Sequence, residues 1–172
     1  MITIGIDNGS TGSIGIIAPE YRQFLETPSI KSLLGKAERK IMRVNHAELM
    51  KLFSGVVRYN YVGDIKAYIE RPYTGRFMNA MLPGQRAFEA TLVCLETHRI
   101  AYEVIDSKAW QKSIIGGSVK GSEDLKAASA TIGKKLFPDF SDIIDKHGDA
   151  DGLLIAYYHH LLRIAKEPNN CA

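Results

Sequence analysis

Ile2-Thr3-Ile4-Gly5-Ile6-Asp7, followed by Asn8-Gly9-Ser10-Thr11-Gly12-Ser13, is the stretch of sequence that decides the fold. Its isoleucines alternate with other residues, which predicts a β-strand with one buried face that ends at Asp7. The six small, polar or glycine residues that follow predict a tight turn, and isoleucines resume in residues 14–17 as a second, antiparallel strand. A carboxylate that ends a strand, open to solvent among small residues, can hold a cation; a turn aspartate that bonds its own loop is the alternative interpretation.

The length and composition predict one globular domain over residues 1–172, with 45% hydrophobic residues available for a core. A formal net charge of +3 permits a nucleic-acid partner without requiring one. Cys94 and Cys171 are far apart in the chain, which favours free thiols and a reducing cytoplasm. No apolar run approaches the roughly 20 residues of a membrane span, and no signal peptide precedes the first strand. We therefore expect a cytoplasmic protein with no membrane partner.

After a third antiparallel strand at residues 21–26, residues 28–44 are expected to be loop-like or weakly helical. This segment holds five basic residues, so it is either a solvated connection or an edge for a phosphate backbone. Asn45 then predicts a helix N-cap, with Glu48 as its capping-box partner, and the amphipathic helix that follows ends near Arg58.

A short strand at residues 67–70 is stopped by Pro72, which places Glu70 at the C-terminal end of a strand, as Asp7 is. Residues 71–82 predict a long exposed loop in which aromatic and basic side chains interleave. That mixture suits stacking on bases together with phosphate contacts; the alternative is that the aromatic side chains tuck under the loop. The candidate DNA-binding residues of this loop are Arg71, Tyr73, Arg76 and Phe77.

Residues 83–99 predict a helix with two apolar stripes, which would pack on the sheet and also on a partner subunit or another helix of the same chain. A strand at residues 102–105, a short helix containing Trp110 and a glycine-rich loop around Lys120 come next. A further helix covers residues 122–136, with acids at its start and lysines at its end as the helix dipole prefers.

The last helix is predicted to begin around residues 147–151 and to run to about Lys166. His147, Asp149 and Asp151 crowd its first turn, where acids have a plain explanation in the helix dipole. Two acids and a histidine within five residues exceed what capping requires, because like charges this close repel unless something positive lies between them.

Taken together, the elements predict an α/β fold with a mixed central sheet of three antiparallel strands plus parallel strands, flanked by helices. The first strand is central and the strand that ends at Glu70 lies beside it. Carboxylate oxygens from several elements suit Mg²⁺ or Mn²⁺, and two such ions could clamp a phosphodiester for hydrolysis. The bridging carboxylate is expected from the most rigid element, which assigns that part to Asp7.

These residues resemble the RuvC-like Holliday-junction resolvases of the ribonuclease H-like superfamily, with the bacteriophage and chloroplast branches nearest. The resemblance covers nearly the whole chain, and the order and spacing of its motifs are more specific than any one motif. The matching stretches are residues 4–7 with the turn after them, 68–70, 83–85, 116–120 and 150–156.

The resemblance implies a homodimeric endonuclease that uses two Mg²⁺ or Mn²⁺ ions per active site and nicks two strands of a four-way DNA junction symmetrically. By position, Asp7, Glu70 and Asp151 match the metal-binding acids of the family. Lys120 matches a loop lysine near the cleaved backbone, and Tyr73 matches an aromatic residue that wedges into the opened junction centre. The helix at residues 83–99 matches the one used for dimerisation.

The chain also departs from the bacterial pattern, in which two aspartates lie three residues apart, because the upstream position here is Gly148. Either Asp149 replaces the missing acid, or His147 does, since it matches a histidine before the last helix in the chloroplast branch. Both are kept as candidate catalytic and metal-binding residues.

Three other interpretations stay open. Residues 5–12 also look like the phosphate loop of actin-like ATPases and sugar kinases, although those folds need two such domains and a far longer chain. The second interpretation is a non-catalytic nucleic-acid-binding module. The third is a nuclease of the same fold that acts on flaps, forks or RNA–DNA hybrids.

Overall fold

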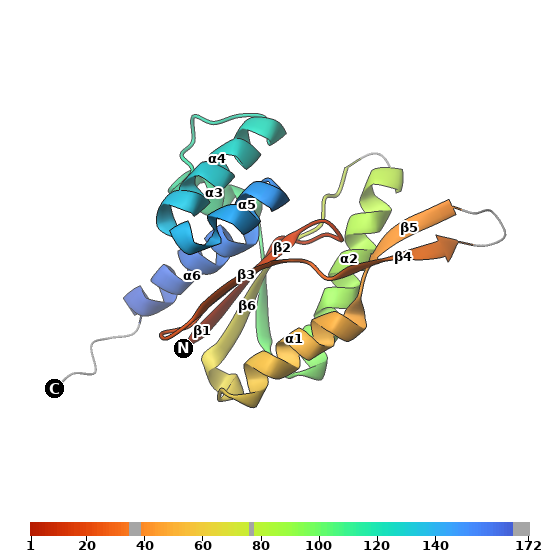
Figure 1. The fold of residues 1–172 in the computed structure, drawn as a ribbon, viewed down its shortest axis with the longest axis horizontal. Helices are drawn as coiled ribbons and strands as arrows, with labels where there is room; N and C mark the ends of the chain where they lie inside the picture. The colour runs from red at the N-terminus through yellow and green to blue at the C-terminus, as the bar shows by residue number, and fades with distance from the viewer. Residues whose placement is uncertain (35–38, 76–77, 167–172) are drawn as a thin grey trace.

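A five-stranded mixed sheet forms the centre of the protein, whose computed structural model describes residues 1–34, 39–75 and 78–166 (Figure 1). The strand order is β3-β2-β1-β6-β7, with β1–β2 and β2–β3 antiparallel and β1–β6 and β6–β7 parallel. This is the predicted sheet, with β1 central and the Glu70 strand beside it. The strands are β1 (Ile2–Ile6), β2 (Ser13–Ile17), β3 (Arg22–Glu26), β6 (Ile65–Glu70) and β7 (Ala101–Ile105).

Helices cover both faces of the sheet (Figure 1). One face packs against α1 (His46–Arg58) and α2 (Met78–Thr97), and the other against α6 (Asp151–Lys166). The helices α3 (Ser107–Ile114), α4 (Ser122–Leu136) and α5 (Ser141–His147) lie on the α6 side of the sheet, and short 3₁₀ turns lie at Val62–Asp64 and Pro138–Phe140. Within the described ranges, no helix has the length and apolar character that crossing a membrane would require.

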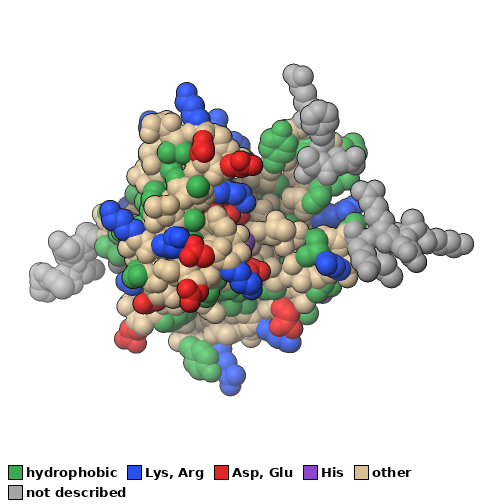
Figure 2. Space-filling model, turned by 45° about the horizontal axis from the view of Figure 1, so that its top comes forward, with side chains coloured by type: hydrophobic (Ala, Val, Ile, Leu, Met, Phe, Trp, Pro, Cys, Tyr) green, Lys and Arg blue, Asp and Glu red, His purple; other side chains and the backbone are tan. Residues whose placement is uncertain are grey.

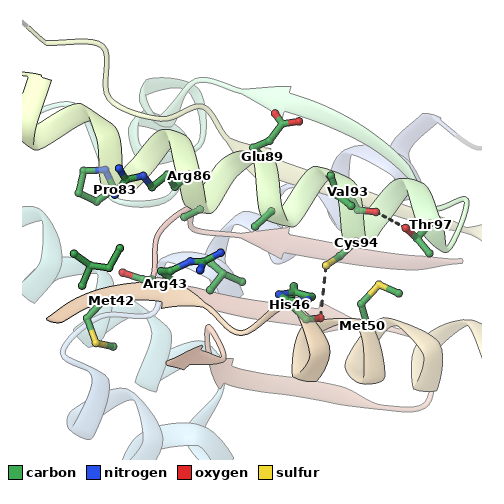
Figure 3. A pocket seen from close by; sticks show the side chains of 15 residues that line it. Met42, Arg43, His46, Met50, Pro83, Arg86, Glu89, Val93, Cys94 and Thr97 are labelled. Carbon is green, nitrogen blue, oxygen red and sulfur yellow. Dashed lines mark hydrogen bonds between the residues drawn. The ribbon is translucent and has the colours of Figure 1, made fainter. Parts of the chain in front are cut away.

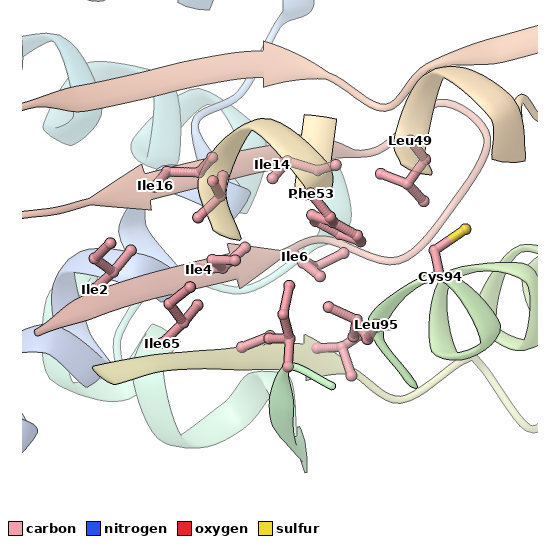
Figure 4. Close-up of a cluster of buried hydrophobic side chains, with 14 of the residues drawn as sticks. Ile2, Ile4, Ile6, Ile14, Ile16, Leu49, Phe53, Ile65, Cys94 and Leu95 are labelled. Carbon is pink, nitrogen blue, oxygen red and sulfur yellow. The ribbon is translucent and has the colours of Figure 1, made fainter. Parts of the chain in front are cut away.

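The isoleucines of β1, with Ile14 and Ile16 of β2, point into the layer between the sheet and the first two helices. There they meet Leu49, Phe53 and Leu95 (Figure 4). The sequence predicted only one buried face for β1, yet all five of its residues are buried. The second face carries Thr3 and Gly5 and is covered by α6, whose His160 Nδ1 lies 3.1 Å from the Thr3 hydroxyl oxygen. Because helices cover both faces of the sheet, its central strand has no exposed face.

Glycines set the distance between α6 and the sheet. Gly5 and Gly15 lie opposite each other across β1 and β2. A Cβ atom at Gly5 would fall 2.2 Å from the Ala156 nitrogen, and one at Gly152 would fall 2.5 Å from the Ser13 carbonyl oxygen. Only glycine allows this approach of main chain to main chain, and the Gly152 N–H donates to Ser13 Oγ at 3.1 Å. The start of α6 is thereby fixed against the end of β1.

The expectation of a loop or weak helix at residues 28–44 is wrong. The chain there forms β4 (Ser29–Leu34) and β5 (Arg39–Val44), an antiparallel pair separate from the main sheet (Figure 1). Ile30, Ile41 and Val44 belong to a strand pattern, but the interspersed basic residues and Gly35 obscured it in the sequence. The Asn45 cap that follows is confirmed, because the Glu48 N–H donates to Asn45 Oδ1 at 3.3 Å.

Two helix boundaries also differ from prediction. Helix α2 begins at Met78 and contains Pro83 in its interior, so the predicted loop is shorter than residues 71–82. His147 does not open the last helix. It is the final residue of α5, a helix the sequence analysis missed, and Gly148 ends that helix with a left-handed φ of 96°. Glycine is the usual residue at such a C-terminal position.

The small-residue stripe of α2 faces the protein's own core. Ala87, Thr91 and Cys94 are buried, and the Cys94 thiol donates to the His46 carbonyl oxygen at 3.8 Å. Of the two predicted contacts for this stripe, another helix of the same chain is therefore the observed one. The large hydrophobic side chains that remain exposed in the described part of α2 are Met78, Leu82 and Val93.

Candidate metal centre

Asp7 lies directly after β1 and is enclosed by the turn that follows it. Its N–H donates to the Ser13 carbonyl oxygen at 3.0 Å. A Cβ atom at Gly12 would lie 2.2 Å from the Asp7 carbonyl oxygen and 3.1 Å from Asp7 Oδ2, so the turn needs glycine there to close around the carboxylate. Asp7 is half-buried, in contrast to the solvent-exposed position expected from the sequence.

Asp149 and Asp151 reach Asp7 from the segment that leads into α6. Each of the three carboxylates offers an oxygen within 4.8 Å of the others. The close contact of Gly152 with the strands brings Asp151 to this position, and Ser129 of α4 donates a hydrogen bond to Asp151 Oδ1. The structure thus unites the first strand with residues almost 150 positions later in the chain.

Glu70 ends β6, the parallel neighbour of β1, so it emerges at the same edge of the sheet as Asp7. The indole N–H of Trp110 donates to Glu70 Oε1 at 2.6 Å. The pKa of Glu70 is raised to about 8, first by burial and then by the charges of Asp7 and, more weakly, Asp151 and Asp106, while the Trp110 hydrogen bond opposes the rise. Glu70 therefore belongs to the same electrostatic cluster as the three aspartates.

Asp7 and Asp151 also have raised pKa values, for the same two reasons of burial and nearby negative charge. Burial and the neighbouring Asp149 raise the pKa of Asp7 to about 6. Burial and the same neighbour raise the pKa of Asp151 to about 7, against the hydrogen bond from Ser129. Four carboxylates with too few cations favour a bound divalent ion, and hard oxygen donors suit Mg²⁺ or Mn²⁺. The residues present fit such an ion.

Asp149 is the exception, because its side chain is only 2% exposed and still has a lowered pKa. Burial opposes ionisation of this carboxyl, but His147 and Lys126 outweigh that effect. Lys126 Nζ lies 3.2 Å from Asp149 Oδ2, and His147 Nε2 lies 3.3 Å from Asp149 Oδ1 without the angle of a hydrogen bond. His147 contacts Asp149, and it is the carboxylate of Asp149 that lies close to those of Asp7 and Asp151.

Three residues of the site were missed by the sequence analysis: Trp110, Lys126 and Ser129. Lys126 and Ser129 are three residues apart, so they share one face of α4. Trp110 is the single tryptophan of the chain and is fully buried. A polar pair on one helix face and a lone tryptophan before a glycine-rich loop were readable signals, but nothing in the sequence showed which elements α3 and α4 would face.

The predicted DNA-binding residues lie around the acids rather than among them. Tyr73 is 67% exposed and lines a cavity of about 460 Å³ together with Glu70 and Lys108. Arg71 also lines this cavity and pairs with Asp106. Lys120 is exposed, and in the described part of the chain its ammonium forms no ion pair with an acid. Arg76 and Phe77 lie outside the described residues.

Cavities adjoin the acids on the surface as well. The 460 Å³ cavity begins at Glu70, and a second one of about 300 Å³ is lined by Gly12 and His147. Figure 2 shows this side of the molecule hollowed, with Lys and Arg side chains at several places around the acidic ones. An extended polyanion could therefore approach the acids.

Two solved structures share this fold. A T. thermophilus RuvC "in complex with Holliday junction substrate" matches with a TM-score of 0.56 and 12% identity, covering 96% of this chain and 96% of that chain. A second Thermus thermophilus RuvC structure matches with a TM-score of 0.53 and 14% identity, covering 94% of this chain and 96% of that chain. The predicted RuvC-like, ribonuclease H-like fold is confirmed; the bacteriophage or chloroplast branch stays a prediction.

No protein-family model matches the sequence, and no curated protein sequence matches it.

Proposed function

We propose that this protein is a metal-dependent endonuclease that resolves four-way DNA junctions. The observation that carries the proposal is the meeting of Asp7, Asp149 and Asp151 within 4.8 Å, beside Glu70, at one edge of a RuvC-like sheet. The RuvC-like fold alone would also fit a module that only binds DNA. A cluster of carboxylates whose pKa values are raised by burial and mutual repulsion is poorly suited to holding DNA without cations.

Asp7, Glu70, Asp149 and Asp151 would hold the ions, with Asp7 as the shared ligand because it lies at the end of the central strand. Ions held there would supply the chemistry of phosphodiester hydrolysis, by activating a water and stabilising the leaving 3′-oxygen. Hydrolysis of the bond from phosphorus to the 3′-oxygen would leave a 5′-phosphate and a 3′-hydroxyl. Ser129 orients Asp151 by its hydrogen bond, and Trp110 orients Glu70.

The sequence left open whether His147 or Asp149 completes the metal site, and we propose a different role for each. A carboxylate oxygen of Asp149 lies within 4.8 Å of oxygens of Asp7 and Asp151, so Asp149 is the proposed ligand. His147 then acts as a positioning residue that holds Asp149 from behind, at 3.3 Å. Lys126 places a positive charge beside the cluster, and Lys120 is proposed to contact the cleaved backbone from its exposed loop.

The substrate class is tested by an Mg²⁺-dependent cleavage assay on four-way junctions, forks, flaps, RNA–DNA hybrids and linear duplexes side by side. Paired symmetric nicks on the junction are the expected result. Preference for forks, flaps or hybrids would keep the metal chemistry and replace the substrate, whereas binding of junctions without any cleavage would make the chain a non-catalytic module.

Symmetric cleavage requires two active sites, and we propose that the chain forms a homodimer through the exposed face of α2. Val93 is 52% exposed there, and Met78 and Leu82 are exposed as well. A largely apolar cavity of about 670 Å³ adjoins this face, and Figure 3 shows α2 residues from Pro83 to Thr97 on one side of it and Met42, Arg43, His46 and Met50 on the other. None of the metal-centre acids lines this cavity.

The dimer is tested by light scattering coupled to size-exclusion chromatography. Val93→Glu is expected to yield monomers, and Val104→Glu, at an exposed valine of β7, is the control that should leave the dimer intact. A wild-type protein that is monomeric at micromolar concentration would contradict the dimer without touching the metal chemistry.

A further inference from the structure

A second polar cavity borders the metal centre and has no part in holding the ions. Its volume is about 300 Å³, and it lies where the turn after β1 meets the end of β3, the base of β4 and the end of α5. Its lining is rich in hydroxyl groups, from Ser10, Thr11, Thr27 and Ser29. Lys146, His147, Gly12, Glu26 and Met42 complete it. Several hydrogen-bond donors with one adjacent lysine suit an anion with several acceptor oxygens.

Thr27 gives this cavity the character of a built site. Its side chain is only 6% exposed, and Oγ1 has no hydrogen-bond partner among the described residues. The Thr27 N–H donates to the Gly12 carbonyl oxygen at 2.8 Å, so the residue is held against the turn that encloses Asp7. A buried hydroxyl without a partner destabilises a fold. Because Thr27 lines the cavity, a rotation of its side chain would bring this hydroxyl to a ligand oxygen there and satisfy it.

The charges around the cavity favour a phosphate. Lys146 Nζ lies 3.5 Å from Glu26 Oε1, a long and mostly exposed pair that leaves the lysine able to meet a ligand. On the β4–β5 hairpin, the exposed Lys31 is paired with Met42 and therefore lies on the same face as this wall of the cavity. Residues 29–44 contain five of the 22 basic residues and one of the 19 acidic ones, more net positive charge than the +3 of the whole chain.

The cavity and the metal centre share their walls. Gly12 lines the cavity and lies against Asp7, and His147 lines it and lies 3.3 Å from Asp149. A DNA strand with one phosphate at the acids would therefore place a neighbouring phosphate at or near the cavity, since phosphates repeat at short intervals along a strand.

We propose that this cavity is a phosphate-binding subsite for the DNA backbone, with Thr27 Oγ1 as a buried donor and the basic β4–β5 hairpin continuing the path of the strand. The inference rests on the proposed nuclease function and adds where the uncut part of the strand is held. It also gives the small-residue turn a physical role, because Ser10, Thr11 and Gly12 form one wall of the subsite.

The first test is Thr27→Val, which keeps the shape of the side chain and removes its hydroxyl. Junction affinity is measured by fluorescence anisotropy with Asp7→Asn as the background, so that no strand is cut. Affinity is expected to fall about 10-fold, the effect of losing one hydrogen bond to a charged group, while the melting temperature stays equal or rises because no unpaired hydroxyl remains. A merely structural hydroxyl would instead lower the melting temperature and leave the affinity unchanged, and that result would overturn the subsite.

Thr91→Val is the matched control, since Thr91 is equally buried but its hydroxyl donates to the Ala87 carbonyl oxygen inside α2. It is expected to leave junction affinity within twofold of the background. An equal loss of affinity in both variants would overturn the assignment, because it would trace the effect to general destabilisation.

The second test compares two exposed lysines by the salt dependence of binding. Lys146→Ala is expected to reduce the slope of log affinity against log salt by about 0.9, the value for one phosphate contact. Lys134→Ala removes the same charge from a lysine paired with Asp145 and should leave the slope unchanged. Glu26→Gln should strengthen binding, because it removes the one carboxylate that lines the cavity. Equal slopes for both lysine variants would overturn the subsite.

The outcomes separate this inference from the proposed function. Wild-type protein that cuts junctions, together with a Thr27→Val variant of unchanged affinity, overturns the subsite alone. Wild-type protein that neither binds nor cuts DNA overturns the proposed function. Titration with ATP and with inorganic phosphate covers the other source of a phosphate group, and ATP binding that Thr27→Val weakens without affecting DNA binding would overturn the assignment to DNA.

Discussion

Lys126 Nζ lies 3.2 Å from Asp149 Oδ2, so a lysine of α4 reaches the acidic cluster. Asp149 is almost fully buried and yet has a lowered pKa, because His147 and Lys126 outweigh the effect of burial. The neighbouring Asp7 and Asp151 both have raised pKa values, and Asp149 is a cause of each. One ion pair thus keeps one acid charged at the expense of its neighbours.

Lys126→Met is predicted to lower both stability and cleavage. The loss in free energy of unfolding should be about 1 kcal/mol, because the lysine is more than half exposed and solvent screens the pair. Thermal melts and single-turnover cleavage rates measure the two effects. Lys51→Met removes a lysine from the exposed pair with Glu48 and serves as control; equal effects of both variants would contradict a special role for Lys126.

Asp7→Asn is predicted to abolish cleavage, by at least about 100-fold, and to leave junction binding intact. In the proposed function the acids would hold the ions needed for the chemistry, whereas lysines and arginines would hold the backbone. Cleavage assays and anisotropy on the same junction measure the two properties. Asp142→Asn, at an exposed acid of α5, should retain wild-type activity. Full activity of Asp7→Asn would end the proposed metal chemistry.

The stability of the metal-free protein is predicted to fall as the pH rises from about 4 to about 8. Asp7, Asp151 and Glu70 have pKa values of about 6, 7 and 8 in the folded state, against 3.8, 3.8 and 4.5 as ordinary values. The folded state therefore binds protons more tightly than the unfolded chain, and the stability that those protons confer is lost as they leave.

Mg²⁺ should reverse this trend, because the ion competes with the same protons and binds better at higher pH. At 100 times its dissociation constant an ion adds about 2.7 kcal/mol. Melts in EDTA and in Mg²⁺ at pH 5 and pH 8 measure both effects. An equal Mg²⁺ shift at the two pH values would show that the raised pKa values do not belong to the metal ligands.

Trp110→Phe is predicted to shift the acid limb of the pH–rate profile to higher pH by about one unit. The indole N–H opposes the rise in the pKa of Glu70, and a hydrogen bond to a charged group is worth about 1.5–3 kcal/mol. The ring that remains still fills much of the buried volume. A lower rate at every pH, with no shift of the limb, would make Trp110 a packing residue only.

Tyr73→Ala is predicted to slow junction cleavage more than it weakens junction binding. The side chain is exposed beside Glu70, where it can stack on bases at an opened junction centre. Rates on a junction and on a nicked duplex, with the affinity for each, separate the two effects. Tyr59→Ala, at a comparably exposed tyrosine after α1, is the control. Equal junction rates for wild type and Tyr73→Ala would refute the wedge.

The central position of β1, with β6 beside it, was predicted because the strands of the main sheet carried local sequence patterns. Alternating isoleucines indicated β1 and β2. The carboxylates that end β1 and β6 were expected at the same edge of the sheet, because the two strands are parallel neighbours. Asn45 marked the start of α1 for the same reason, since its cap is a contact within four residues. These features depend on short-range physics that a sequence displays directly.

The remainder depended on contacts between distant segments. Lys126 and Trp110 enter the site only because α3 and α4 pack around α6, and no local pattern records that packing. The β4–β5 hairpin was missed because basic residues occupy positions in a strand that lies outside the main sheet. His147 was predicted at the start of the last helix, but it ends α5. The two helices were not distinguished because only a short segment containing Gly148 separates α5 from α6.

The main-chain contact between Gly5 and α6 bears on how the proposed metal centre would select an ion. A Cβ atom at Gly5 would require α6 to move by roughly 1 Å, since packed atoms do not interpenetrate. Oxygen ligands sit at about 2.0–2.1 Å from Mg²⁺ and about 2.3–2.6 Å from Ca²⁺, so that displacement exceeds the difference between the two ions. Discrimination by ionic radius would then be decided by a residue that has no side chain and touches no ion.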